Sequence, residues 1–494
     1  MAVNFVCGFI VSIMVVRGLS QEHYGGYKLI STILSVGPLL YGFGLESALA
    51  RFGTEILARG QRNKLLRFVF QILGIRGGAI LLIIALSVFV WTDFAAFFNF
   101  PDVLAEHPVP VIMIVILTAT NLLWGTALHA VRMAQYQDRL TDISLAIFRL
   151  IAFGFAVWMG WGLTGIIFSW SATLAFGTVQ HTVRNVRWIS RMRRMRDDAG
   201  VESTEQVLFR RRVVRFAALS AITGSIYVMK DIAVDNLVIA KMLGPESVAL
   251  YGLVTTIVLM VIQVNPVGIM RSVTNTWIVH RYHENSDPAM LLKIFRTLNK
   301  ATLVVSLPLY VSLIVLGDKV IGIVFRPDYL AAYPTLVVLC STMFFVDLAR
   351  AFQPLIFVLE KKELELAIFV LAVYNLVLDI VLVPQFGIIG AAIATGSANV
   401  LQLLFLYGAF WIYVGLPVRF PFSALARVTI ILMPVVGVTI VVRPFVTSIP
   451  LLITVFVVSG IYYVFMVVKL GPFDDDERQT CRQALGYLLD KAKT

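Results

Sequence analysis

The sequence predicts an all-α membrane protein with about fourteen transmembrane helices, arranged as two six-helix lobes and two further helices. Three observations predict this class. The 494 residues are 59% hydrophobic and 14% charged, whereas a soluble protein of this length normally has about 25% charged residues. Apolar stretches near the ~20 residues that cross a bilayer recur from end to end. The second half of the chain also repeats motifs of the first half.

The apolar stretches define the expected spans in order. Their approximate ranges are 2–16, 27–49, 68–91, 109–131, 142–160, 163–183, 217–240, 249–270, 300–316, 335–358, 365–383, 388–413, 424–442 and 447–468. The first range is short for a bilayer, and either a start upstream or a thinned membrane would explain it. It has neither a basic leader nor a small-residue cleavage motif, which favours a span over a signal peptide.

Basic residues alternate between the loops and predict the topology. Basic residues gather in the loops expected on one side, and the segment 184–216 alone has ten arginines. The opposite loops have few, and 93–108 has no Lys or Arg. This positive-inside pattern predicts cytoplasmic N- and C-termini. It also explains the net charge of +12 without a nucleic-acid partner.

An internal repeat divides the spans into two sets. Residues 17–33 (RGLSQEHYGGYKLISTI) match residues 241–257 (KMLGPESVALYGLVTTI) at a constant offset. A second match, one residue out of phase, joins GLTG at 162–165 to GIIG at 387–390. The copies begin six spans apart, so both lobes would cross the membrane in the same sense. Parallel repeats of this kind enclose the central site of many carriers.

The repeat predicts five consecutive regions. Helices 1–6 occupy residues 1–183, a basic cytoplasmic linker 184–216, helices 7–12 residues 217–416, helices 13 and 14 residues 417–470, and an amphipathic cytoplasmic tail 471–494. The linker is open to two interpretations. It is either an amphipathic surface helix that holds anionic lipid or a basic segment that enforces topology, and the second is favoured.

The motifs of common enzyme classes are absent from the sequence. There is no GxxxxGK[ST] phosphate loop, no HExxH, no GxSxG and no Cys/His cluster, so we expect neither ATP hydrolysis nor another enzymatic activity and no cofactor. The three cysteines are scattered along the chain and imply no disulfide framework.

Basic residues at membrane depth favour a cavity for a phosphate-bearing substrate, because guanidinium groups bind phosphate bidentately. The candidate ligands are Arg51, Arg76, Arg149, Lys230 and Arg350. Alternatives stay open. Arg51 lies at a span end, where it would extend to lipid headgroups. Arg350 is placed to pair with Asp347 at i,i+3. Arg76, Arg149 and Lys230 fit a structural role as well as a cavity.

A second set of polar residues suits a hard cation. Asp231 and Asp235 share a face of one helix at i,i+4, as do Asn375 and Asp379 on another, and Thr395 follows in the next span. Their oxygens would suit Na⁺ or a coupling proton. Spacing alone favours the alternative that Lys230 or an arginine neutralises each aspartate.

Three motifs resemble one transporter family. GLESALARF at 44–52, LGPESVALYG at 243–252 and LVPQFGIIGAAIATG at 382–396 resemble polysaccharide-biosynthesis flippases of the multidrug/oligosaccharidyl-lipid/polysaccharide (MOP) exporter superfamily, whose fold is MATE-like. The resemblance covers essentially the whole chain. It implies a carrier in the bacterial inner membrane that moves an undecaprenyl-diphosphate-linked oligosaccharide by alternating access. The substrate would be an O-antigen, capsule or exopolysaccharide repeat unit, with membrane lipids and a polysaccharide polymerase as partners.

Lipid II flippases of the same superfamily also have fourteen spans. The resemblance implies a sodium site, because Asp235, Asn375, Asp379 and Thr395 match the positions of the sodium ligands in that family. The departure is in helix 1, where the family has arginines and this chain has Cys7, Ile10 and their neighbours. A lipid II substrate is therefore the less favoured alternative.

Two other function classes stay open. A cation-coupled multidrug or metabolite antiporter of the same superfamily is opposed by the two extra spans and by several arginines at membrane depth. A non-transporting scaffold is opposed by the same ionisable residues, because their insertion into a membrane is costly.

Overall fold

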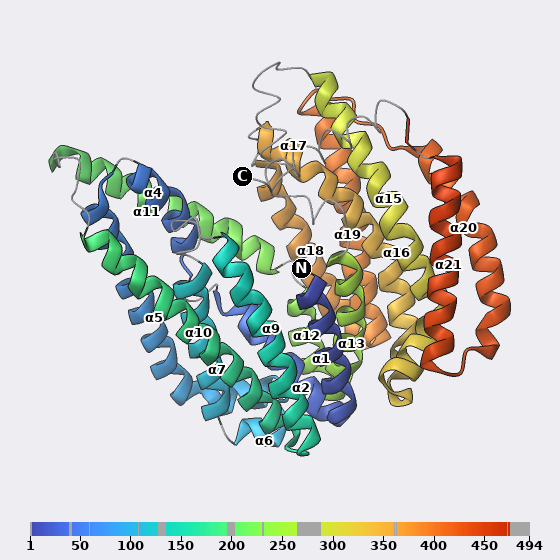
Figure 1. Ribbon diagram of the computed structural model, residues 1–494, viewed down its shortest axis with the longest axis horizontal. Coiled ribbons are helices and arrows are strands. Elements are labelled where there is room, and N and C mark those ends of the chain that lie inside the picture. Colours follow the sequence, from blue (N-terminus) through green and yellow to red (C-terminus); the bar gives the residue numbers. More distant parts are fainter. Residues whose placement is uncertain are drawn as a thin grey trace. The chain divides into compact units, whose positions relative to one another are not determined.

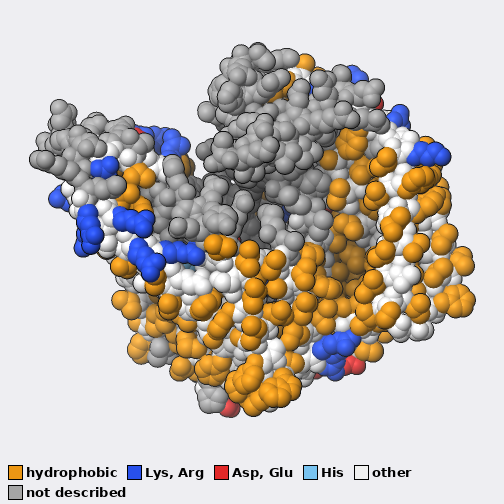
Figure 2. Space-filling model, in the orientation of Figure 1, with side chains coloured by type: hydrophobic (Ala, Val, Ile, Leu, Met, Phe, Trp, Pro, Cys, Tyr) orange, Lys and Arg blue, Asp and Glu red, His pale blue; other side chains and the backbone are white. Residues whose placement is uncertain are grey.

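The computed structural model of the protein describes residues 2–38, 42–58, 60–106, 108–126, 135–194, 203–229, 232–263, 288–359, 361, 363–471 and 473–474. Every regular element within these ranges is a helix. Ten helices of the described part are long and apolar enough to cross a membrane, and Val3–Gly18 and Val109–Asn121 are shorter apolar helices. The predicted all-α polytopic class is therefore confirmed. On the face shown in Figure 2, hydrophobic side chains cover much of the described surface, and Lys and Arg side chains lie in smaller groups.

The chain divides into two compact units, Met1–Gly252 and Leu253–Thr494. The helices of the first unit are α1 (Ala2–Gly18), α2 (Gln21–Val36), α4 (Leu45–Ala58), α5 (Arg62–Phe97), α6 (Asp102–Ala105), α7 (Val109–Asn121), α9 (Gln135–Trp158), α10 (Gly162–Arg194), α11 (Ser203–Met229) and α12 (Ile232–Leu243). Helix α13 (Pro245–Gln263) crosses the boundary between the units.

The second unit includes one long helix, α15, and two helical hairpins, α18–α19 and α20–α21. It contains α15 (Pro288–Lys319), α16 (Tyr333–Ala349), α17 (Gln353–Val358), α18 (Glu363–Phe386), α19 (Ile388–Ile412), α20 (Phe422–Val442) and α21 (Ile449–Leu470). The π-helical segment Val320–Phe325 and the 3₁₀ segments Pro327–Ala332, Arg350–Phe352 and Arg443–Phe445 connect or extend these helices.

In the first unit, two groups of helices pack around apolar side chains. Helix α1 contacts α9, and α10 runs alongside both α7 and α9 (Figure 1). Helix α4 lies between α5 and α11, where Phe52, Leu65 and Val69 are buried in one hydrophobic cluster. Burial of these apolar faces stabilises the helix packing and so positions the polar residues described below.

In the second unit, α19 is the central helix. It contacts both α16 and α18, and 56% of its most apolar window is buried, compared with 11% for α21. Phe295, Phe352 and Phe410 form an aromatic cluster with ring centroids 4.6 Å and 5.0 Å apart. Helix α20 packs on α15, and α21 packs on α20. The two helices outside the predicted repeat therefore lie at the outer edge of this unit.

The internal repeat is visible in the helix boundaries. Helix α2 begins at Gln21 and α13 at Pro245, which are equivalent positions of the first match. The second match places Gly162 at the first position of α10 and Gly387 directly before α19, and the two glycines have φ values of 62° and 61°. A positive φ favours glycine because it has no Cβ. The matched residues therefore mark the same helix starts in both copies.

The span expected at 27–49 is interrupted in the structure. Helix α2 ends at Val36, and a turn at Gly37 separates it from Pro38. Proline cannot donate the amide hydrogen bond that would continue α2. Helix α4 begins at Leu45. The described residues of the span expected at 217–240 lie in α11 and α12. The linker predicted at 184–216 is helical at both ends, because α10 extends to Arg194 and α11 begins at Ser203.

Candidate functional site

A polar cavity lies among α1, α7, α9 and α10 of the first unit. Its volume is about 270 Å³, and it is lined by Asn4, Asn121, Asp142, Leu145, Ala146, Arg149, Trp170, Thr173 and Leu174. Two of the lining residues, Asp142 and Arg149, are seven residues apart on α9, and residues at i and i+7 share one helix face. Opposite charges thus line one wall. We call this space the Arg149 cavity.

The guanidinium of Arg149 extends toward α1. A Cβ placed on Gly8 would lie 3.3 Å from an Nη atom of Arg149, so the absence of a side chain at Gly8 leaves room for the guanidinium. The Nε atom of Arg149 is buried, and within the described residues it has no hydrogen-bond partner. A buried donor of this kind favours a ligand that accepts hydrogen bonds.

The amide and hydroxyl groups of the cavity are held by their neighbours. Asn121 donates to the carbonyl oxygen of Leu174 at 2.6 Å and to the Thr178 hydroxyl at 2.7 Å, and Thr173 donates to the Ser169 carbonyl at 2.8 Å. The two Asn121 bonds fix α7 against α10. The walls of the Arg149 cavity are therefore pre-organised.

Arg76 does not line the Arg149 cavity. It lies on α5, its side chain is fully buried, and its Nη1 donates to Glu46 Oε1 of α4 at 2.6 Å. Glu46 is 31% exposed. The assignment of Arg76 to the diphosphate stays a prediction, and the geometry places it in an ion pair between two helices.

Arg51 is exposed at the junction of α4 and α11, and its guanidinium lies 5.2 Å from the centroid of the Phe216 ring. This cation–π contact is consistent with the alternative of a span-end arginine. Lys230 and Asp231 lie outside the described residues, so their assignments to the diphosphate and to the cation site stay predictions.

The alternative expected for Arg350, an ion pair with Asp347, is observed in the second unit. Arg350 Nη1 lies 3.5 Å from Asp347 Oδ1, and the Tyr310 hydroxyl donates to Asp347 Oδ2 at 3.0 Å. Asp347 is fully buried, whereas Arg350 is 27% exposed. The carboxylate therefore joins α15 to the end of α16.

Four of the five residues proposed for a cation are described, and all four are buried, but they belong to two units. In the first unit, Asp235 of α12 accepts a hydrogen bond of 2.6 Å from the Tyr251 hydroxyl. In the second unit, Asn375 and Asp379 are on α18 and Thr395 is on α19. The structure does not determine how Asp235 lies relative to the other three.

The α18–α19 hairpin brings the residues of the second unit to one depth. Asp379 and Thr395 are each eight residues from Gly387, where the chain turns, so both lie about 12 Å from the turn. A Cβ on Gly390 would lie 2.3 Å from the Leu382 carbonyl oxygen, which shows how closely the two helices approach. Asn375 precedes Asp379 by one helical turn of α18 and so lies farther from the turn at Gly387.

Several polar residues of the first unit were not among the predicted site residues. Asn4, Asn121 and Asp142 line the Arg149 cavity. Lys28 is half-buried in α2, and its Nζ lies 5.5 Å from the centroid of the Tyr24 ring. The signal for each was a polar side chain inside, or at the edge of, an apolar span.

Together, the long apolar helices and the polar groups buried among them define a multi-pass membrane protein. A family model described as "Polysaccharide biosynthesis protein" matches residues 14–334. The chain belongs to this family, as its motifs predicted. A comparison with curated protein sequences finds no match.

Two solved structures share the fold. "Lipid II flippase MurJ, inward closed conformation" has 15% sequence identity and a TM-score of 0.69, and the match covers 94% of this chain and 96% of that one. A "multidrug resistance MATE family transporter of the MOP superfamily", in an inward-facing conformation, has 12% identity and a TM-score of 0.64, with 83% and 95% covered. These similarities confirm the predicted MATE-like fold.

Proposed function

We propose that this protein is a flippase for a polyprenyl-diphosphate-linked oligosaccharide, a repeat unit of an O-antigen, a capsule or an exopolysaccharide. The observation that carries the proposal is the Arg149 cavity, where the buried Nε of the guanidinium has no hydrogen-bond partner among the described residues and where amides and the Asp142 carboxylate also line the walls. Phosphate oxygens accept hydrogen bonds from a guanidinium, which binds them bidentately. Membership of the polysaccharide biosynthesis family supports a sugar-bearing substrate.

The proposed path separates the three parts of the substrate. Arg149, with Lys230 as the second cation, holds the diphosphate while the sugar crosses in water and the lipid tail stays in the bilayer. The protein acts in the bacterial inner membrane with cytoplasmic termini, and it delivers its product to a polysaccharide polymerase. It has no enzymatic step, because the substrate changes leaflet and no bond is broken.

Two energy sources are available to the proposed carrier. The membrane potential favours outward movement of an anionic headgroup by about 2.3 kcal/mol per charge per 100 mV. Na⁺ or H⁺ that binds at Asp235, Asn375, Asp379 and Thr395, with Asp231 nearby in the sequence, would reset the carrier.

The test combines Arg149→Ala with Lys230→Ala. We expect loss of surface polysaccharide with an unchanged amount of protein in the membrane, because the diphosphate loses both proposed cations. Surface polymer is measured by immunoblotting, and leaflet transfer by reconstitution with lipid-linked sugars. Arg187→Ala with Arg191→Ala is the matched control, since it removes two exposed arginines of α10 that do not line the Arg149 cavity. Normal polymer in the double variant would contradict the proposal.

A further inference from the structure

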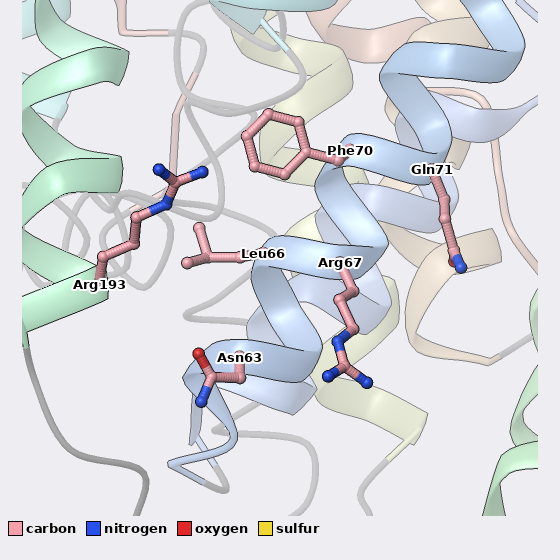
Figure 3. Close-up of a pocket in the computed structure, with 6 residues that line it drawn as sticks. All are labelled: Asn63, Leu66, Arg67, Phe70, Gln71 and Arg193. Carbon is pink, nitrogen blue, oxygen red and sulfur yellow. The ribbon is translucent and has the colours of Figure 1, made fainter.

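A second polar space lies at one end of the first unit, and it shares no residue with the Arg149 cavity. Its volume is about 510 Å³, and it is lined by Asn63, Leu66, Arg67, Phe70 and Gln71 of α5 and by Arg193 of α10. Figure 3 shows Arg193 projecting from its helix toward α5, with Leu66 pointing back toward it and the Phe70 ring above. We call this space the α5–α10 groove.

The α5 residues of the groove form one continuous helix face. They occupy positions i, i+3, i+4, i+7 and i+8 from Asn63, which is the spacing of a single stripe on an α-helix. Leu66 is 6% exposed and forms the floor. Asn63, Arg67, Phe70, Gln71 and Arg193 are exposed. The groove is therefore accessible from outside the protein.

Among the described residues, the charged groups that line the groove are both cations. Arg67 and Arg193 contribute guanidinium groups, Asn63 and Gln71 contribute amides, and no described carboxylate lines the space. Within the described part of the chain, neither guanidinium is in an ion pair. Arg193 lies 5.8 Å from the centroid of the Phe70 ring. This set of donors suits a phosphate group, which accepts hydrogen bonds and is negatively charged.

The position of the groove matches the level of lipid headgroups. It lies in the first turns of the candidate span Arg62–Leu86 and at the last turn of α10, at the end that the charge pattern predicts to be cytoplasmic. Exposed apolar side chains continue along α5 from Phe70 to Ile75, Leu81 and Leu82. The acyl chains of a lipid whose phosphate is in the groove would thus lie along the apolar face of α5.

We infer that the α5–α10 groove binds the phosphate headgroup of an anionic membrane phospholipid. Basic pockets between helices on the cytoplasmic side are typical binding places for such headgroups. The two arginines would hold the phosphodiester, and Phe70 would contact the first part of an acyl chain. This lipid would join α5 to the end of α10, independently of the substrate that the carrier moves.

The experiment measures lipid binding to the purified full-length protein by native mass spectrometry. Phosphatidylglycerol and phosphatidylcholine are titrated in detergent. We expect the wild type to bind one phosphatidylglycerol about tenfold more tightly than phosphatidylcholine, and Arg67→Gln with Arg193→Gln to remove this preference. The matched control is Arg187→Gln with Arg191→Gln, which removes the same charge from exposed positions of α10 outside the groove. The control should keep the preference.

Three outcomes would overturn the inference. Equal affinity of the wild type for both lipids would show that the groove does not select a charged headgroup. An equal loss in both double variants would show diffuse attraction to the basic helix end. Displacement of phosphatidylglycerol by excess inorganic phosphate would assign the groove to a soluble anion.

If the double variant unfolds, Arg67→Gln and Arg193→Gln are measured singly, and each should lose part of the preference. Two single variants that keep the full preference would contradict the inference.

Discussion

The buried ion pair between Arg76 and Glu46 illustrates how residues 30 positions apart are joined in this fold. Arg76 is fully buried on α5, and the carboxylate of Glu46 on α4 lies 2.6 Å from it. An unpaired charge at a buried position costs free energy, so Arg76 depends on Glu46 to neutralise it. The pair joins two helices on either side of the loop near Gly60.

Glu46→Gln should destabilise the protein by roughly 2 kcal/mol. The substitution removes the charge that neutralises Arg76, and the usual penalty for a broken buried pair is reduced here because Glu46 is partly exposed. The unfolding temperature in detergent measures the change. Glu55→Gln on the same helix is the matched control. Its partner Arg212 is 55% exposed, so we expect a loss below about 0.5 kcal/mol. Equal effects of the two substitutions would contradict this account.

Local sequence predicted some side-chain partners and missed others for a physical reason. The Asp347–Arg350 pair followed from i,i+3 spacing, and the structure confirms it. The Arg76–Glu46 pair depends on how α4 folds back onto α5, which no short-range spacing contains. Asp142 and Asn4 likewise meet at the Arg149 cavity only through the packing of α1 on α9.

At the scale of helices, glycines allow the close approach of α2 to the start of α13. A Cβ on Gly25 would lie 1.9 Å from the Pro245 carbonyl oxygen, and a Cβ on Gly252 would lie 2.7 Å from Lys28. Lys28 and Gly252 are equivalent positions of the repeat. Nearby, Asn236 of α12 donates to the Thr32 hydroxyl of α2 at 3.1 Å. Related segments of the two copies are therefore in contact.

Gly25→Val should separate α2 from α12 and α13. Its side chain would overlap a backbone oxygen that has no rotamer to change, and overpacking of this kind costs about 1–3 kcal/mol. We expect the disulfide yield of a Thr32→Cys and Asn236→Cys pair, in a background without the native cysteines, to fall severalfold. Gly74→Val is the control, since nothing lies within 4 Å of a Cβ at Gly74. An unchanged yield in Gly25→Val would show that the contact tolerates the extra volume.

Helix boundaries were predictable where glycine or proline decides them. The helix starts at Gly162 and Gly387 follow from a backbone that favours glycine. The break after Val36 was missed because the apolar run continues on both sides of Pro38, and hydropathy alone does not register the lost hydrogen bond. Composition also predicted the 25-residue helix α19 within a residue or two of its ends, since apolar length is set by the membrane.

At the scale of the whole molecule, our proposal couples the transport cycle to an ion gradient through the buried oxygens of the α18–α19 hairpin. Asp379 is fully buried, and Asn375 and Thr395 are 5% and 6% exposed. A carboxylate at such a depth is stabilised by a bound cation or proton, and binding of either would shift the population of carrier states. The coupling is reciprocal, so substrate would also change the affinity for the ion.

Asp379→Asn should remove the dependence of transport on the ion gradient while leaving substrate binding intact. In proteoliposomes that contain lipid-linked sugars, we expect an imposed sodium or proton gradient to accelerate leaflet transfer by the wild type at least severalfold, and to have no effect on the variant. Because the amide keeps the shape of the carboxylate but not its charge, the fold should persist. Ser397→Ala is the control, since within the described part of the chain the Ser397 hydroxyl donates only to the Ala394 carbonyl of its own helix. If Asp379→Asn keeps the full dependence on the gradient, the coupling ion binds elsewhere. If both variants lose the same share of leaflet transfer measured without a gradient, the substitutions have damaged the hairpin.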